Sequence, residues 1–103
     1  MELEFVGELW YWRGPAPFHF ITVPAGPCEA IRTVARMATY GWGMIPVTVR
    51  IGETEWTTSL FPKDDTYLLP LKAAVRKRIG VTVDDEVEVE MTIGGGGFRL
   101  SGF

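Results

Sequence analysis

Apolar and polar residues alternate strictly near the end of the chain, where Val87, Val89 and Met91 are separated by single glutamates. A period of two predicts a half-buried strand, with the glutamates on the side that meets water. The same alternation runs through residues 2–12, with Gly7 in the middle. The polar side of this segment ends in two tryptophans. Either Gly7 marks a bulge that exchanges the two faces, or both indoles lie outside the strand end.

Two segments carry the helical period instead. In residues 24–41, Pro27 suits the first turn of a helix, and Gly41 can end it. In the second segment Pro70 is predicted to begin the helix, because its ring fixes φ near the helical value and it has no N–H to satisfy. Gly80 can end that helix in the left-handed conformation. A helix this short does not persist alone in water, so we expect it to dock on the rest of the domain.

A hairpin in the middle of the chain is predicted in a single register. Gly52-Glu53 form a two-residue connection with glycine first, as a type II′ turn prefers. One face then pairs mostly apolar residues, Ile51 with Thr54, Val49 with Trp56, Val47 with Thr58 and Ile45 with Leu60. The other face pairs Thr48 with Thr57, and Arg50 with Glu55 as an ion pair. A slip by one residue would bury the arginine, so the register is well specified.

These elements follow one another as strand, strand, helix, strand, and the order then repeats. The repeat indicates two ββαβ halves in one chain. The predicted fold is therefore mainly β with two short helices, a single β-barrel domain over residues 1–93. Residues 94–103 begin with four glycines, which cannot sustain a strand at low entropic cost. We predict that they form a glycine-rich flexible tail.

Composition limits the classes of function. The 103 residues suffice for one domain, and a hydrophobic share of 47% supplies its core. The net charge of −3 argues against a general binder of nucleic-acid phosphates. One cysteine excludes an internal disulfide and a cysteine-based zinc cluster, one histidine cannot make a metal site, and nothing implies a cofactor. No segment has the pattern of a signal peptide or of a membrane span, so we expect a cytoplasmic protein.

The second helix and its flanking strands resemble the swapped-hairpin signature of AbrB-type proteins. Pro70, Arg76, Gly80 and Val87 hold the matching places. AbrB-type chains usually have a glycine before the acidic turn residue, where this chain has Asp84, so the turn geometry is expected to differ. Those chains supply one ββαβ half and dimerise. The resemblance implies that two halves in one chain close the barrel alone, as a monomer.

Residues 2–92 also resemble a small prokaryotic domain family of unknown function, whose structures are double-split β-barrels grouped with AbrB, MazE and MraZ. The most specific segment is Trp56-Thr57-Thr58-Ser59-Leu60-Phe61-Pro62, followed by Leu69-Pro70-Leu71-Lys72 and Val75-Arg76-Lys77. The resemblance implies a double-split β-barrel made of two ββαβ halves. It implies no established activity.

Several side chains could carry a binding function. Lys72 and Arg76 lie four residues apart on one helix face, and could grip an anion or form a solvated basic face. Thr57 and Ser59 lie on the polar face of the hairpin, where hydroxyls can hold a ligand or satisfy the backbone. As a nucleophile Ser59 lacks a Gly-x-Ser-x-Gly elbow, and only His19 could serve as a histidine base.

Two tryptophans could likewise have either a binding role or a structural one. Trp42 stands between two glycines, and its indole could floor a pocket or plug one end of the barrel. Trp12 could pack as core or, if exposed beside Trp10, indicate a patch for a partner.

Three functions remain open. The first is a non-enzymatic binding module for a small anionic ligand or a protein partner, using Trp12, Trp42, Thr57, Ser59, Lys72 and Arg76. The second, by analogy with the AbrB fold, is a nucleic-acid-binding regulator, for which the basic side chains would have to form one face. The third is an enzyme that uses Ser59 or a carboxylate. We expect a monomer, with a weak dimer as the alternative if a tryptophan patch is exposed.

Overall fold

The computed structural model describes residues 1–37 and 44–93, in which six strands and two helices form. In chain order these are β1 (Glu2–Trp12), β2 (Phe18–Thr22), α1 (Ala25–Met37), β3 (Ile45–Ile51), β4 (Thr54–Lys63), β5 (Thr66–Leu71), α2 (Ala73–Ile79) and β6 (Glu86–Ile93). The order ββαβ occurs twice, which confirms the two predicted halves. Trp42 and the predicted tail, residues 94–103, lie outside the described residues.

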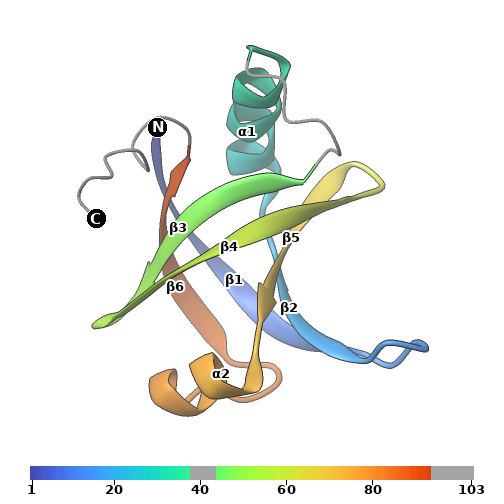
Figure 1. The fold of residues 1–103 in the computed structure, drawn as a ribbon, viewed down its shortest axis with the longest axis vertical. Coiled ribbons are helices and arrows are strands. Elements are labelled where there is room, and N and C mark those ends of the chain that lie inside the picture. The colour runs from blue at the N-terminus through green and yellow to red at the C-terminus, as the bar shows by residue number, and fades with distance from the viewer. Residues whose placement is uncertain (38–43, 94–103) are drawn as a thin grey trace.

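The six strands close into a barrel in the order β1-β2-β5-β4-β3-β6, with every neighbouring pair antiparallel (Figure 1). The two halves interleave, because β1 and β3 of the first half both pair with β6 of the second. Neither half could therefore complete a buried core by itself. The predicted fold class, a mainly β barrel with two short helices, is confirmed.

The β3–β4 hairpin has the predicted register. Ile51 lies opposite Thr54 at the turn, and Ile45 lies opposite Leu60 at the far end. Gly52 has a φ of +61°, as the first central position of a type II′ turn requires. Inward and outward residues alternate along β3, so the apolar face of the hairpin lines the barrel.

The ion pair predicted across this hairpin is wrong. Arg50 does lie opposite Glu55, but its Nη2 donates to Oε1 of Glu90 on β6, at 2.8 Å. Its Nε donates to the same oxygen at 3.2 Å. The reason is barrel closure, which places β6 along the other edge of β3 and brings Glu90 directly opposite Arg50.

β1 runs without a bulge, because its register with β6 is continuous from Glu2 to Glu8. Gly7 has a different role: a Cβ there would lie 2.5 Å from Cγ2 of Ile21, so glycine permits close packing between β1 and β2. The faces of β1 are not exchanged, so Trp10 and Trp12 lie outside the barrel. Of the two predicted alternatives, this is the one without a bulge.

The predicted start of the second helix is wrong. Pro70 lies within β5, opposite Phe20, and α2 begins only at Ala73. The ladder between β4 and β5 ends at Leu68, so the missing N–H of Pro70 costs no bond to β4. Leu71, which follows Pro70 and so fell within the predicted helix, is instead a strand residue of the barrel core.

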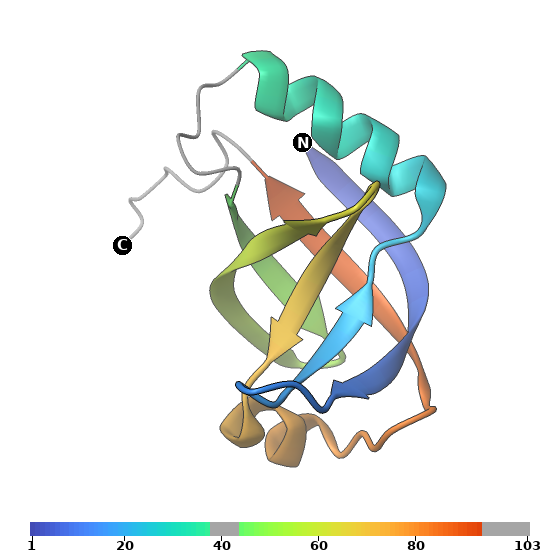
Figure 2. The same cartoon turned by 90° about the vertical axis from the view of Figure 1, so that its right-hand side faces the viewer.

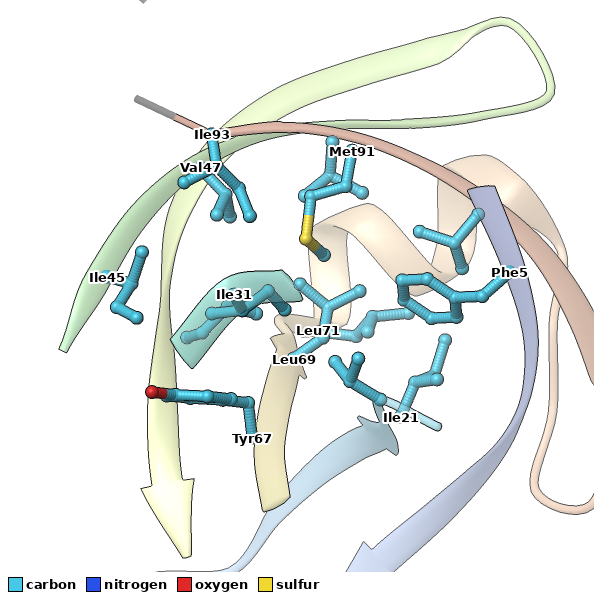
Figure 3. Packing of buried hydrophobic residues seen from close by; sticks show 14 of the residues in the cluster. Phe5, Ile21, Ile31, Ile45, Val47, Tyr67, Leu69, Leu71, Met91 and Ile93 are labelled. Atoms are coloured by element: carbon cyan, nitrogen blue, oxygen red, sulfur yellow. The ribbon is translucent and has the colours of Figure 1, made fainter. Parts of the chain in front are cut away.

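The core fills the barrel interior with aliphatic side chains from all six strands (Figure 3). Leu9, Ile21, Ile45, Val49, Leu60 and Leu69 are fully buried. The helices lie at opposite ends of the barrel (Figures 1 and 2). From α1, Ile31 and Cys28 join the core, and the thiol of Cys28 donates to the carbonyl of Val23 at 3.2 Å. From α2, Ile79 packs against the core and remains half-buried.

Across the two described stretches, neither helix combines the length and the apolar character needed to cross a membrane.

Candidate functional site

The structure separates the predicted site residues into two groups. Trp12 is on the outward side of β1, and Thr57 and Ser59 are on the outward side of β4. Lys72 caps the start of α2, and Arg76 lies in its middle. Trp42, the sixth, is outside the described residues.

Helix α2 carries a concentrated positive charge. Arg76, Lys77 and Arg78 occupy its last turn, where the negative end of the helix dipole favours cations. Gly80 ends the helix at a φ of +81° and donates its N–H to the carbonyl of Arg76, at 2.8 Å. This confirms the predicted glycine stop. Because Ile79 packs against the core, the helix is fixed to the barrel end and its basic residues are fixed with it.

Arg76 differs from the other described arginines in its surroundings. Its side chain is half-buried, and its Nε is shut off from solvent with no hydrogen-bond acceptor in residues 1–37 and 44–93. Among the described side chains, the ion pairs join Arg32 to Glu29 and Arg50 to Glu90, and neither includes Arg76. A buried donor without an acceptor costs free energy, and for a charged group the cost is larger.

Two aromatic side chains flank the same end of the barrel. The rings of Tyr11 and His19 stand opposite each other on β1 and β2, with centroids 4.7 Å apart. His19 also lies opposite Leu71, the last residue of β5 before α2. Its partial burial, and then the positive charge of Arg76, lower the pKa of His19 below its ordinary 6.5. The imidazole is therefore neutral at pH 7 and faces the field of an unpaired guanidinium.

This arrangement can bind an anion. Arg76 supplies charge and a fixed fork of N–H donors, and Tyr11 and neutral His19 can each donate one hydrogen bond. The sequence pattern joins neither aromatic residue to Arg76, and it offers His19 only as a possible base for Ser59. The strand pattern does hint at them. Tyr11 and His19 occupy positions that alternate with the outward residues of their strands, and both lie near the strand end where the barrel opens. Their proximity to α2 depends on barrel closure, which the sequence pattern does not show.

A second group of aromatic side chains covers the outside of the barrel. We call it the outer aromatic face, and it consists of Trp10, Trp12, Phe18, Phe20 and Phe61. Phe20 is at its centre, with ring centroids 5.5 Å from Trp10, 5.6 Å from Phe18 and 6.2 Å from Phe61. Nε1 of Trp10 donates to Oγ1 of Thr22 at 2.9 Å. Leu68 is buried although it too faces outward on β5, between β2 and β4.

Ser59 and His19 lie on opposite sides of the barrel wall. Ser59 precedes the inward-facing Leu60 and so faces outward, whereas His19 alternates with the outward rings of Phe18 and Phe20. The two side chains therefore do not form the nucleophile–base pair that a serine hydrolase requires.

The remaining outer surface is acidic. We call it the glutamate face, and its carboxylates come from outward positions of β1 and β6, namely Glu2, Glu4, Glu8, Glu86, Glu88 and Glu90. A groove of about 620 Å³ runs along it, lined partly by Glu2, Glu4 and Glu90, with Arg50 and Glu55 from the hairpin. None of the five predicted site residues that the structure describes lines this groove. The hydrogen bond to Glu90 raises the pKa of Arg50, whose charge is already matched there.

Metal ligands do not gather at either surface. Within residues 1–37 and 44–93, no three histidine, cysteine or acidic side chains are placed to hold a metal ion together.

Comparison with protein families gives one match, to a domain of unknown function, DUF1905, over residues 5–91. The chain belongs to the DUF1905 family. The match begins within β1 and ends within β6, so this DUF1905 domain includes both ββαβ halves. No curated protein matches the chain. The family description states no activity, so the function of the DUF1905 domain has to be argued from its geometry.

Proposed function

We propose that this DUF1905 domain is a non-enzymatic binding module for a small anionic ligand, held at the barrel end that α2 covers. One observation carries the proposal: the Nε of Arg76 is buried and finds no acceptor among the described residues. If the half-buried Arg76 side chain turned outward, a carboxylate or phosphate oxygen would supply that acceptor and balance the charge. Bonds from a guanidinium to such groups are among the stronger hydrogen bonds in proteins, and are often bidentate.

The residues around Arg76 suit the same ligand. Lys72 lies one helical turn earlier and is exposed, and the backbone N–H of Arg76 bonds to its carbonyl at 3.0 Å. Tyr11 and His19 add neutral donors on the barrel side. A site that combines one charged fork with neutral donors favours a small, compact anion over a long polyanion.

Trp12, Thr57 and Ser59 lie on the outside of the barrel, so they take no part in this anion site. Thr57 faces outward opposite Thr48, which lines the acidic groove. Trp12 and Ser59 face outward on the side of the barrel that carries the outer aromatic face. Such a surface suits a larger partner, namely the protein partner that was the other predicted occupant of the binding module. No observation favours the enzyme alternative built on Ser59.

We also propose that the barrel belongs to the double-split group that includes AbrB, MazE and MraZ, and that it acts as a monomer. Two features support this: both ββαβ halves lie in one chain, and together they close the barrel. Asp84 adds support, because its φ of +77° is the left-handed conformation that a glycine would take at that place.

A thermal-shift titration with citrate and with inorganic phosphate tests the anion site. A ligand at ten times its Kd adds about 1.4 kcal/mol to the free energy of unfolding, which raises the Tm by several degrees in a domain of this size. Arg76→Gln should abolish the shift. Lys77→Gln is the matched control, because it removes the same charge from the next, exposed position. Equal shifts in the two variants would show general charge screening and contradict the proposal.

A further inference from the structure

The outer aromatic face keeps two of its rings in contact with solvent. Phe20 is buried at its centre, but Trp12 is 38% exposed and Phe61 is 40% exposed. These rings lie at the ends of separate strands, on either side of the buried centre. Flat rings held open on a rigid sheet can stack with flat groups of a ligand.

The Trp12 indole has two close neighbours. The ammonium of Lys63 lies 5.3 Å from its ring centroid, in a cation–π contact. The ring also lies against Gly14, where a Cβ would collide with the indole. The ring is therefore pre-positioned, and its orientation depends on a glycine in the β1–β2 loop.

Charge divides the outside of the barrel into two unlike sides. The outward residues of β2, of β5 and of β4 from Ser59 onward include no carboxylate. Lys63 is among them, and the exposed Arg13 and Lys72 border this side at the ends of β1 and β5. The carboxylates that border it are Asp64 and Asp65, which follow Lys63 in the β4–β5 turn. The carboxylates of the glutamate face are on the other side. The net charge of −3 is thus an average over two faces, and does not describe the outer aromatic face.

We propose that the outer aromatic face binds single-stranded nucleic acid, with bases stacked on Trp12 and Phe61 and phosphates near Arg13, Lys63 and Lys72. This function goes beyond the anion site and shares only Lys72 with it. Its rings and test residues are different, so either proposal can fail alone. A single strand fits because its bases are free to stack on protein rings, whereas the bases of a duplex are already stacked on one another. Each nucleotide of a single strand carries one flat base and one phosphate. The base can stack on an exposed ring while the phosphate lies near a neighbouring cation.

Fluorescence anisotropy with a fluorescein-labelled 12-nucleotide mixed-sequence DNA strand tests the proposal at low salt. Three neutralised phosphates predict that log K falls with log salt concentration at a slope of about −2. Trp12→Ala should weaken binding by roughly 5- to 100-fold, the loss of one stacked base. Gly14→Ala should weaken it to a similar degree, because the new Cβ displaces the indole without removing it. Since that ring is exposed, neither change should disturb the barrel.

A charge-matched pair provides the control. Lys63→Gln and Arg50→Gln change the net charge equally, but Arg50 lies on the side of the glutamate face. Lys63→Gln should weaken binding of the strand at least threefold, and Arg50→Gln should leave it unchanged. Equal effects of the two, tighter binding of the duplex of the same sequence, or no binding at 20 mM NaCl would overturn the proposal. So would binding only to phosphatidylglycerol vesicles, which would make this face a membrane contact instead.

Discussion

Gly7 on β1 and Ile21 on β2 pack so closely that a Cβ on Gly7 would lie 2.5 Å from Cγ2 of Ile21 and 3.1 Å from the carbonyl oxygen of Thr22. Ile21 is fully buried, so it cannot move aside without disturbing the core. This contact, and not a bulge, explains why a glycine interrupts the alternation of β1.

Gly7→Ala should therefore lower the free energy of unfolding by about 1–3 kcal/mol, the usual range for overpacking. Urea denaturation would measure it. Gly26→Ala is the matched control: that glycine lies in α1 with no atom within 4 Å of its would-be Cβ. It should be neutral or stabilising by up to about 1 kcal/mol, because alanine is the better helix former. Equal effects at the two positions would contradict the close contact.

The turn before β6 holds a non-glycine residue in left-handed backbone, Asp84 with a φ of +77°. Asp84→Gly should raise the free energy of unfolding by up to about 1 kcal/mol, since glycine adopts this conformation without steric cost. Asp85→Ala should lower it, because the Asp85 carboxylate accepts the backbone N–H of Thr82 at 2.9 Å. Thermal unfolding of both variants measures the difference, and a destabilised Asp84→Gly would refute the backbone argument.

The glutamate face contains like charges directly opposite each other, as in the pair Glu8 and Glu86. Glu86→Gln should raise the free energy of unfolding by a few tenths to about 1 kcal/mol at low salt, because it removes this repulsion. Glu88→Gln is the control on the same strand, since Glu88 lies opposite Val6. The difference between the two variants should shrink in 1 M NaCl, and a difference that persisted would point to packing instead.

The depressed pKa of His19 also predicts a pH dependence of stability. The native state binds fewer protons than the unfolded chain between the ordinary pKa of 6.5 and the lower native value. The contribution is therefore fully present above pH 6.5 and is lost as the pH falls below it. NMR titration of the His19 imidazole should give a pKa below 6.5, and Arg76→Gln should move it upward. A pKa at or above 6.5 in the unaltered protein would contradict the placement of Arg76.

Local pattern was enough to predict the β3–β4 hairpin residue by residue, because the glycine turn and the period of two specify the same register. Local pattern failed at Pro70, because a proline suits the start of a helix and also a strand position that makes no hydrogen bond to the next strand. It also failed for Arg50, whose partner Glu90 is 40 residues away and comes close only when the barrel closes.

The candidate site was likewise predictable only where its residues are close together in the chain. Arg76 and Lys72 could be named from one helix, since they are four residues apart. Tyr11 and His19 could not be joined to them, because they come from strands more than 50 residues away in the chain. The separation of charge between the two sides of the barrel is likewise a property of closure, which brings the glutamates of β1 and β6 together.

The most direct measurement of the anion site uses His19 as its reporter, since it is the only histidine in the chain. Its imidazole resonance would be followed by NMR at pH 7 while citrate or inorganic phosphate is added. Because a bound anion offsets the charge of Arg76, the resonance should shift saturably and the pKa of His19 should rise. Both changes should disappear in Arg76→Gln and persist in Lys77→Gln. An unmoved resonance, or equal shifts in the two variants, would contradict the site.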